Sequence, residues 1–201
     1  MANAEIELKL PVDDPQALQS RLRELGFHMQ TPRTFEHNTL YDTPSRELRS
    51  RTEILRIRQY GDTYTVTHKR LADPQSAPSS SRYKVRIETE TTLADGDALA
   101  SIFEHLGYQP VFTYEKYRTE WADASAPSGH VVIDETPIGT YAEIEGPTDW
   151  IDQTLSALRI DPATCITDSY GTLFLNWKQR TGSPADNLTF TEVPAPVLAG
   201  L

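Results

Sequence analysis

The sequence has one cysteine, no long apolar run and far fewer cations than acids, and each shortage excludes a class of protein. Cys165 alone cannot form an internal disulfide, and the histidines lack metal-ligand spacing, so neither a zinc site nor a thiol nucleophile is expected. No stretch approaches the roughly 18 apolar residues of a membrane span. Residues 1–10 carry charges where a secretory signal needs an apolar core, so a cytoplasmic location is expected.

The net charge of the chain limits the classes of molecule that it is expected to bind. Lysine and arginine number 19 against 29 aspartates and glutamates, a formal net charge of -10 over 201 residues. A surface of this sign repels nucleic acid and anionic membranes, so neither is an expected partner. No GxxxxGK pattern occurs, so phosphate groups would have to be bound by side chains at a local basic site.

The first half of the chain has the pattern of a strand, a helix and three further strands. Residues 5–10 alternate between charged and apolar side chains, which is the period of a strand. A helix with acidic residues at its start is expected over about 13–26, where a glycine ends it. A strand over about 34–41 follows, and residues 55–58 and 63–69 are expected to form a hairpin.

A shift of 81 residues aligns the first strand and helix with residues 87–108, which predicts an internal repeat. The second copy continues with a helix expected over about 94–106 and strands near 112–121, 130–135 and 141–146. Eight strands are therefore expected.

The remaining segments define the expected domain. A Pro- and Ser-rich stretch at 71–81 predicts a mobile surface loop between the two copies. Short helices are expected near 150–158 and 170–177, so residues 1–180 are predicted to form one domain. Residues 181–201 have no clear periodicity and predict a flexible tail.

Five of the expected strands carry charges of both signs on one face. The residues are Glu5, Glu7, Lys9, Arg56, Arg58, Lys84, Arg86, Glu88, Glu90, Lys116, Arg118, Glu143 and Glu145. A charged strand face usually points to solvent, but the helices need an apolar surface to cover, and the apolar strand faces supply it. The charged faces are therefore expected to point inward. The expected fold class is α+β: an eight-stranded antiparallel β-barrel of two βαβββ halves with helices packed outside.

Charges inside a barrel must be paired, bound to metal or matched by a charged ligand. A polyphosphate that carries a divalent cation can bind the positive and the negative side chains of the lumen at the same time. Arginine and lysine donate to phosphate oxygens, and carboxylates imply a hard cation, most simply Mg²⁺ or Mn²⁺. The expected partner is therefore a triphosphate-containing small molecule.

The sequence resembles the CYTH superfamily, the triphosphate tunnel metalloenzymes. Residues 5–9, EIELK, look like the family's N-terminal ExExK signature, and NTLYDTP at 38–44 followed by LRIR at 55–58 resembles its second block. Later charged blocks and an acidic hairpin near 133–145 extend the resemblance over residues 4–175. It implies an eight-stranded tunnel, dependence on a divalent metal and activity on triphosphates.

The resemblance also implies roles for individual residues. The metal-site acids would be Glu5, Glu7, Asp134, Glu143 and Glu145, and the phosphate-contacting cations Lys9, Arg56, Arg58, Lys69, Lys84, Arg86, Lys116 and Arg118. The implied catalytic set within them is Glu5, Glu7, Lys9, Arg56, Arg58, Lys69 and Arg118. Glu88 and Glu90 could orient cations, contact the metal through water or form ion pairs.

Three functions agree with these residues. The first is metal-dependent hydrolysis of tripolyphosphate, thiamine triphosphate or a nucleoside triphosphate. The second is cyclisation of ATP to cyclic AMP and pyrophosphate, because the family includes class IV adenylyl cyclases. The third is a non-catalytic polyphosphate-binding module, against which the many carboxylates argue. Hydrolysis is favoured because the sequence identifies no nucleobase pocket, and nothing in it fixes an oligomeric state.

Overall fold

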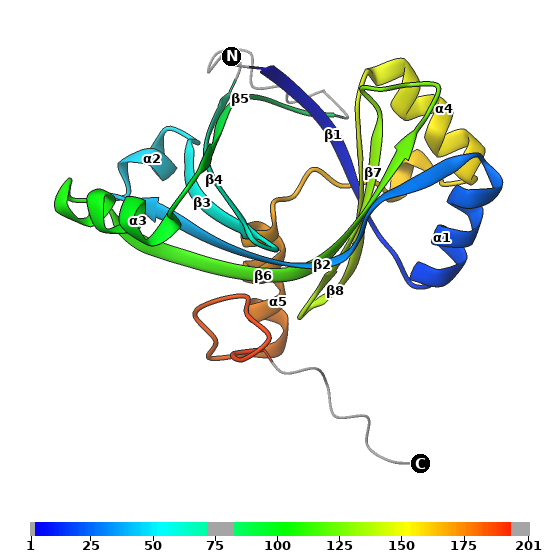
Figure 1. Ribbon diagram of the computed structural model, residues 1–201. Coiled ribbons are helices and arrows are strands. Elements are labelled where there is room, and N and C mark those ends of the chain that lie inside the picture. Colours follow the sequence, from blue (N-terminus) through cyan, green and yellow to red (C-terminus); the bar gives the residue numbers. More distant parts are fainter. Residues whose placement is uncertain (1–2, 72–82, 194–201) are drawn as a thin grey trace.

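A computed structural model of the chain describes residues 3–71 and 83–193, and within them eight strands close into one barrel (Figure 1). The strand order around the barrel is β1-β5-β4-β3-β2-β6-β7-β8, and all neighbouring pairs are antiparallel. The predicted fold class is confirmed. The strands are β1 (Asn3–Pro11), β2 (Phe27–Asp42), β3 (Ile54–Tyr60), β4 (Thr63–Leu71), β5 (Lys84–Leu93), β6 (Gln109–Asp123), β7 (His130–Thr136) and β8 (Gly139–Glu145).

The helices confirm that the order of elements is repeated. α1 (Pro15–Glu24) follows β1, and α3 (Gly96–His105) follows β5. Asp14 caps α1 by accepting from the backbone N–H of Ala17, and Asp95 caps α3 in the same way from Ala98. These cap positions are related by the 81-residue shift seen in the sequence. The glycine after each helix has a positive φ, 88° at Gly26 and 90° at Gly107, which favours glycine.

β2 and β6 are longer than their sequence patterns predict. They contain 16 and 15 residues and pair with each other along most of their lengths. The register of this pair shifts between Met29 and Thr31 and again between Thr31 and Thr34. Such irregularities interrupt the two-residue period, so the first third of β2 carries no clear strand signal in the sequence.

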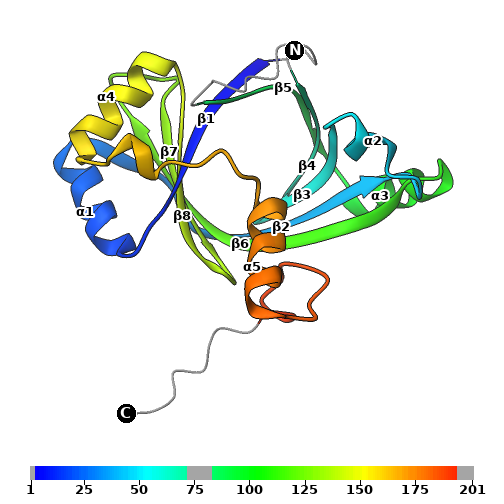
Figure 2. The same cartoon turned by 180° about the vertical axis from the view of Figure 1, so that it is seen from behind.

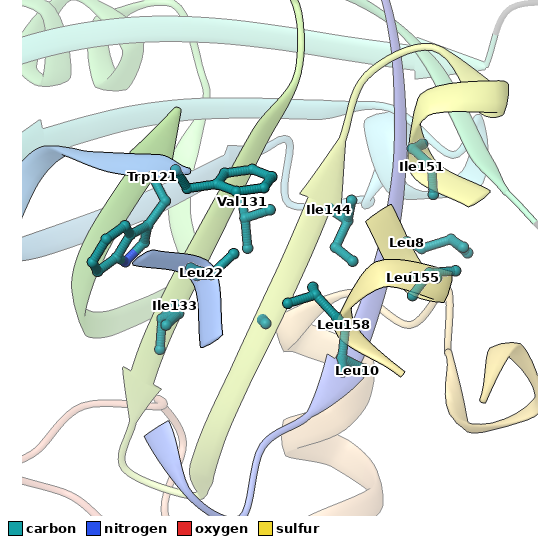
Figure 3. Close-up of a cluster of buried hydrophobic side chains, with 12 residues drawn as sticks. Leu8, Leu10, Leu22, Trp121, Val131, Ile133, Ile144, Ile151, Leu155 and Leu158 are labelled. Carbon is teal, nitrogen blue, oxygen red and sulfur yellow. The ribbon is translucent and has the colours of Figure 1, made fainter. Parts of the chain in front are cut away.

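The main hydrophobic core lies outside the barrel. α1 and α4 (Thr148–Leu158) pack together over the outer face of β1, β7 and β8 (Figures 1 and 2). Figure 3 shows Leu8 and Ile144 from the strands meeting Ile151 and Leu155 from α4, and all four are at most 1% exposed. This burial uses the apolar strand faces, so the opposite faces point into the lumen. α3 covers β3 and β4 on the other side of the molecule, next to the short helix α2 (Glu47–Ser50).

The C-terminal part of the described chain closes one side of the barrel. After a 3₁₀ turn at Pro162–Thr164, α5 (Tyr170–Thr181) packs on β6. Residues 183–193 belong to the segment for which the sequence predicts a flexible tail, yet Leu188 is 0% exposed and Val193 is 3% exposed. The backbone of Leu188 exchanges hydrogen bonds of 2.9 and 3.0 Å with Glu115 and Thr113 of β6. These contacts cover the aromatic residues of α5, which explains why the segment is ordered.

Two predictions concern the ends of the described segments and the crossing of a membrane. The predicted loop at 71–81 and the end of the predicted tail at 194–201 fall, except for Leu71, outside the described residues. Among the described residues, no helix is both long enough and apolar enough to cross a membrane.

Candidate active site

The barrel encloses a cavity of about 540 Å³ that is lined mostly by charged side chains, with Leu40, Phe112 and Val132 among the apolar remainder. All twelve predicted site residues other than Asp134 line it, so the predicted inward direction of the charged faces is confirmed. Its eight cations are Lys9, Arg56, Arg58, Lys69, Lys84, Arg86, Lys116 and Arg118, and its seven carboxylates are Glu5, Glu7, Glu88, Glu90, Glu120, Glu143 and Glu145. Asp134 is 0% exposed and lies behind this wall.

Strand register places opposite charges side by side. Glu5 and Glu7 of β1 are paired in register with Arg86 and Lys84 of β5. On the other edge of β1, Lys9 lies opposite Glu143 of β8. Because side chains alternate along a strand, a single register brings every second residue of neighbouring strands to the same lumen.

One group of ion pairs is formed by β1, β6, β7 and β8. Glu143 pairs with Lys9, and its other oxygen accepts from Arg118 Nη2 at 2.6 Å. Asp134 accepts from Arg118 Nε at 2.7 Å and from Lys116 Nζ at 2.9 Å. Burial alone would raise the pKa of Glu143, but Lys9 and Arg118 hold it well below its ordinary value. Asp134 and Glu143 are therefore engaged by cations in this structure.

Tyr170, the first residue of α5, completes this group. Its hydroxyl donates to Asp134 Oδ2 at 2.6 Å, and its ring lies 4.2 Å from Lys9 Nζ. Burial raises the pKa of the Tyr170 hydroxyl well above its ordinary value, with Asp134 and Glu143 adding to the effect, so the group stays protonated and keeps donating. The helix thus supplies a wall residue to a site otherwise built from strands.

A second group is formed by β1, β3, β4 and β5. Lys69 Nζ contacts Glu5 at 2.7 Å and Glu88 at 3.2 Å, and Lys84 pairs with Glu7. Arg56 Nη2 lies 3.7 Å from Glu90, a residue that also accepts a hydrogen bond of 2.6 Å from Thr67. Of the three roles left open for Glu88 and Glu90, these contacts match ion pairing and orientation of cations.

Glu145 stands apart from both groups. It lies opposite another carboxylate, Glu7, on the neighbouring strand, and no cation within the described residues pairs with it. Burial raises the pKa of Glu145 to about 7, and the nearby charges of Glu5 and Glu7 add to this effect. Three carboxylates that repel one another form a donor set that suits a hard divalent cation. In the described part of the chain no three such groups already converge as metal ligands, since Glu5 and Glu7 are turned toward Lys69 and Lys84.

Several buried guanidinium nitrogens form no hydrogen bond within the described part of the chain, although one of them, Arg58 Nη2, lies 2.8 Å from Glu36 Oε2. Arg56 Nε, Arg58 Nε, Arg58 Nη2 and Arg86 Nε have no hydrogen-bond partner among the described residues. Buried charged donors of this kind are costly unless a ligand satisfies them. The three arginines that carry them line one cavity, which points to an anion with several acceptor oxygens.

The site also contains residues that were not predicted from the sequence: Glu120 lines the cavity, and four others lie in or behind its wall. Glu36 and Asn38 are buried on β2, Tyr114 lies on β6 and accepts from Arg56 Nη1 at 3.1 Å, and Tyr170 comes from α5. Extending the inward face to the strand at 34–41 would have found Glu36 and Asn38, because they share one parity. Tyr170 could not be found in this way, since its place depends on how a distant helix docks.

The comparisons with known proteins agree with this geometry. The CYTH domain profile matches residues 3–171, and the chain belongs to this family. The family is one of metalloenzymes that use divalent cations, and it includes triphosphatases and adenylyl cyclases. "Putative adenylate cyclase MJ0240" of Methanocaldococcus jannaschii is 27% identical over 180 residues, which cover 83% of this chain and 95% of that protein.

Solved structures share the fold. A "putative adenylate cyclase" from Vibrio parahaemolyticus superposes with a TM-score of 0.71 at 19% identity, covering 87% of this chain and 99% of that one. PH1819 of Pyrococcus horikoshii gives a TM-score of 0.68 at 22% identity over 86% of this chain and 99% of its own. HpAC1 of Hippeastrum, a "putative adenylyl cyclase" with a dominant triphosphatase activity, gives 0.60 at 21% identity over 88% and 96% of the two chains.

Proposed function

We propose that this protein is a divalent-metal-dependent phosphohydrolase that cleaves a triphosphate inside the barrel. The observation that carries the proposal is the presence, in one cavity, of unpartnered guanidinium donors and of the carboxylate Glu145, which lacks a cation partner among the described residues. A triphosphate without a bound metal would accept hydrogen bonds from the guanidiniums, but its negative charge would be repelled by the carboxylates. A metal-bound triphosphate satisfies both.

The charge of the lumen supports binding of the metal complex rather than the free anion. Eight cations and seven carboxylates line the cavity, and Glu36 and Asp134 are buried directly behind it. The tunnel without substrate is therefore close to neutral and has little net attraction for a polyanion. An added divalent cation supplies the missing positive charge.

The side chains divide into three roles. Glu5, Glu7 and Glu145 would hold the cation, which when bound supplies Lewis-acid charge at the phosphate oxygens. Arg56, Arg58, Lys69, Lys84 and Arg86 would bind the phosphate chain and offset the charge that develops on the leaving phosphate as water attacks the terminal phosphorus in line. Lys9, Lys116 and Arg118 would complete this set from the opposite wall.

The contacts of Asp134 and Glu143 favour a different role from the metal ligation implied by resemblance. Each is held by two cations of the lumen, one of them Arg118, whereas Glu5 and Glu7 each pair with a single lysine among the described residues. A carboxylate held in this way orients the cation and keeps it charged. We therefore assign Asp134 and Glu143 to the positioning of Lys9, Lys116 and Arg118.

A second candidate is the cyclisation of ATP to cyclic AMP and pyrophosphate. A neighbouring cavity of about 400 Å³ shares Leu40, Ile54 and Phe112 with the tunnel and extends along α2 and α5. This partly apolar space could accept the organic part of a nucleotide, which the sequence alone did not indicate. The name of the Methanocaldococcus relative points the same way, whereas the Hippeastrum protein combines a cyclase name with triphosphatase activity.

One assay separates the candidates. Purified protein is incubated with Mg²⁺ or Mn²⁺ and with tripolyphosphate, thiamine triphosphate or ATP, and orthophosphate, pyrophosphate and cyclic AMP are separated and quantified. Orthophosphate release supports hydrolysis, and cyclic AMP with an equal amount of pyrophosphate supports cyclisation. Tight binding of every triphosphate without turnover would contradict both reactions and support the non-catalytic module.

A further inference from the structure

Glu36 is a buried carboxylate at the tunnel wall to which neither the resemblance nor the comparisons give a role. It lies on β2, opposite Lys116 of β6 in register, and its exposed fraction is 1%. Asn38, which is 0% exposed, donates from Nδ2 to Glu36 Oε1 at 2.9 Å. Among the described residues this is the one hydrogen bond that Glu36 accepts, so its remaining interactions are purely ionic.

Three cations of the lumen surround this carboxylate. Arg58 Nη2 lies 2.8 Å from Oε2, Lys116 Nζ lies 3.3 Å from Oε1, and Arg118 Nε lies 3.8 Å from Oε2. Burial alone would raise the pKa of Glu36, but Lys116, Arg118 and Arg58 hold it well below its ordinary value. Glu36 is therefore a fixed negative charge between two walls of the barrel.

The contact between Glu36 and Arg58 is an ion pair without an aligned hydrogen bond. Despite the 2.8 Å separation, Arg58 Nη2 is not aligned to donate a hydrogen bond to Glu36, and Nε is also without a partner among the described residues. The ring of Tyr60 supports the guanidinium from one face, 4.5 Å from the guanidinium carbon. Arg58, which lines the cavity, is thus held in place by charge and stacking rather than by an aligned hydrogen bond.

We propose that Glu36 is a positioning residue that fixes Arg58, Lys116 and Arg118 before substrate binds. This inference rests on the proposed function for its role in turnover. Without the central carboxylate, three like charges would repel one another at close range, and Arg58 would lose the contact that orders it. Preordered donors avoid the loss of side-chain freedom at the moment of binding and reaction, so the benefit is expected mainly in kcat.

The test compares Glu36→Gln with Glu135→Gln. Glu135 is a matched control because it is also ion-paired to an arginine, Arg33, but outside the barrel. In Glu36→Gln, kcat is expected to fall roughly 10- to 100-fold through misplaced donors, while KM stays equal or falls because a negative charge has been removed from a polyanion site. Glu135→Gln is expected to keep both constants.

A shortened acid provides the conservative variant. Glu36→Asp keeps the charge but withdraws it by one methylene, so a kcat between those of the parent and Glu36→Gln is expected. If Glu36→Gln does not fold, an unchanged kcat in Glu36→Asp overturns the proposal. So does a fall in the stability of Glu36→Gln with kcat and KM of the folded protein both unchanged, since that pattern describes a structural ion pair only.

A spectroscopic measurement separates failure of this inference from failure of the proposed function. The Nε–Hε NMR signal of Arg58, assigned by its loss in Arg58→Lys, is recorded in the substrate-free protein. It is expected to broaden in Glu36→Gln and to stay unchanged in Glu135→Gln. If the parent turns over no triphosphate but this signal responds, the proposed function fails and the positioning role stands. If the parent is active but the signal is unaffected, the positioning role is overturned.

Discussion

Arg86 offers the cleanest test of phosphate binding by a single cation. Among the described residues its Nε has no partner, and Nη1 donates the guanidinium's one hydrogen bond, to the backbone oxygen of Thr52 at 3.3 Å. A charge-assisted contact to phosphate contributes on the order of 1.5–3 kcal/mol. Arg86→Ala is therefore expected to lower kcat/KM by roughly 10- to 100-fold, at about 1.4 kcal/mol per tenfold change.

The melting temperature is expected to change little in Arg86→Ala, because no carboxylate among the described residues forms an ion pair with this guanidinium. Arg70→Ala is the matched control, since Arg70 lies on the neighbouring strand β4 and is exposed on the outer face. Steady-state kinetics and thermal denaturation of both variants check the prediction. Equal kcat/KM in the two variants would remove Arg86 from the substrate site.

Glu145 predicts how stability depends on pH in the metal-free protein. Its pKa is raised from 4.5 to about 7 by burial and by the charges of Glu5 and Glu7. A raised carboxyl pKa means that the folded protein binds the proton more tightly than the unfolded chain does. The stability linked to this proton is complete below about pH 4.5 and is lost as pH rises through about 7.

The variant Glu145→Gln removes this dependence. In EDTA it is expected to be more stable than the parent by on the order of 1–3 kcal/mol at pH 8 and about equally stable at pH 4.5, as followed by chemical denaturation. The same variant is expected to need more Mg²⁺ or Mn²⁺ for half-maximal turnover, because an oxygen ligand has been lost. Equal stability of the two proteins at pH 8 would show that Glu145 has a charge partner in solution.

At the level of single residues, alternation in the sequence was sufficient for most of the site. Lys9, Arg56 and Arg118 could be placed in the lumen because neighbouring strands turn the same parity inward. The partners of the lumen carboxylates could not be assigned. Whether a carboxylate binds a metal ion or a lysine or arginine side chain depends on distances between strands that are far apart in the chain. The pairing of Asp134 with Arg118 is one such case.

At the level of elements, the two helix caps test whether the repeats contribute equally to stability. Asp14 and Asp95 each accept a backbone hydrogen bond of 2.9 Å from the residue three positions later. Replacing such a cap by alanine typically costs about 0.5–2 kcal/mol. Asp14→Ala and Asp95→Ala are therefore expected to lower the free energy of unfolding by similar amounts while kcat/KM stays unchanged. A loss of activity in either variant would show that the helix also supports the lumen.

Elements with local signals were predictable, and those that depend on docking were not. Caps, terminal glycines and alternation locate α1, α3, β1 and β3 from the sequence. The first part of β2 is irregular and could not be recognised. Residues 183–193 have no period of their own, and their burial arises from β6 and α5, which offer Leu188 a backbone partner and an apolar surface.

At the level of the whole molecule, the near balance of charge in the lumen predicts that metal and triphosphate stabilise the fold jointly. A ligand that binds only the folded state at 100 times its Kd raises stability by about 2.7 kcal/mol. In a chain of this size, such a change raises the melting temperature by roughly 5–10 °C. Mg²⁺ with tripolyphosphate is expected to give a shift of this size.

Tripolyphosphate in EDTA, or Mg²⁺ alone, is expected to give less than half of that shift. The free anion would meet seven carboxylates of the cavity without a cation to bridge them, and the free cation would meet eight positive side chains. Differential scanning fluorimetry of all four combinations measures the coupling, with Arg86→Ala and Glu145→Gln run in parallel. Arg86→Ala should weaken the effect of the complex through the anion, and Glu145→Gln through the metal. Full stabilisation by tripolyphosphate in EDTA would mean that the lumen binds the anion by its cations alone, and the proposed metal role of Glu5, Glu7 and Glu145 would be wrong.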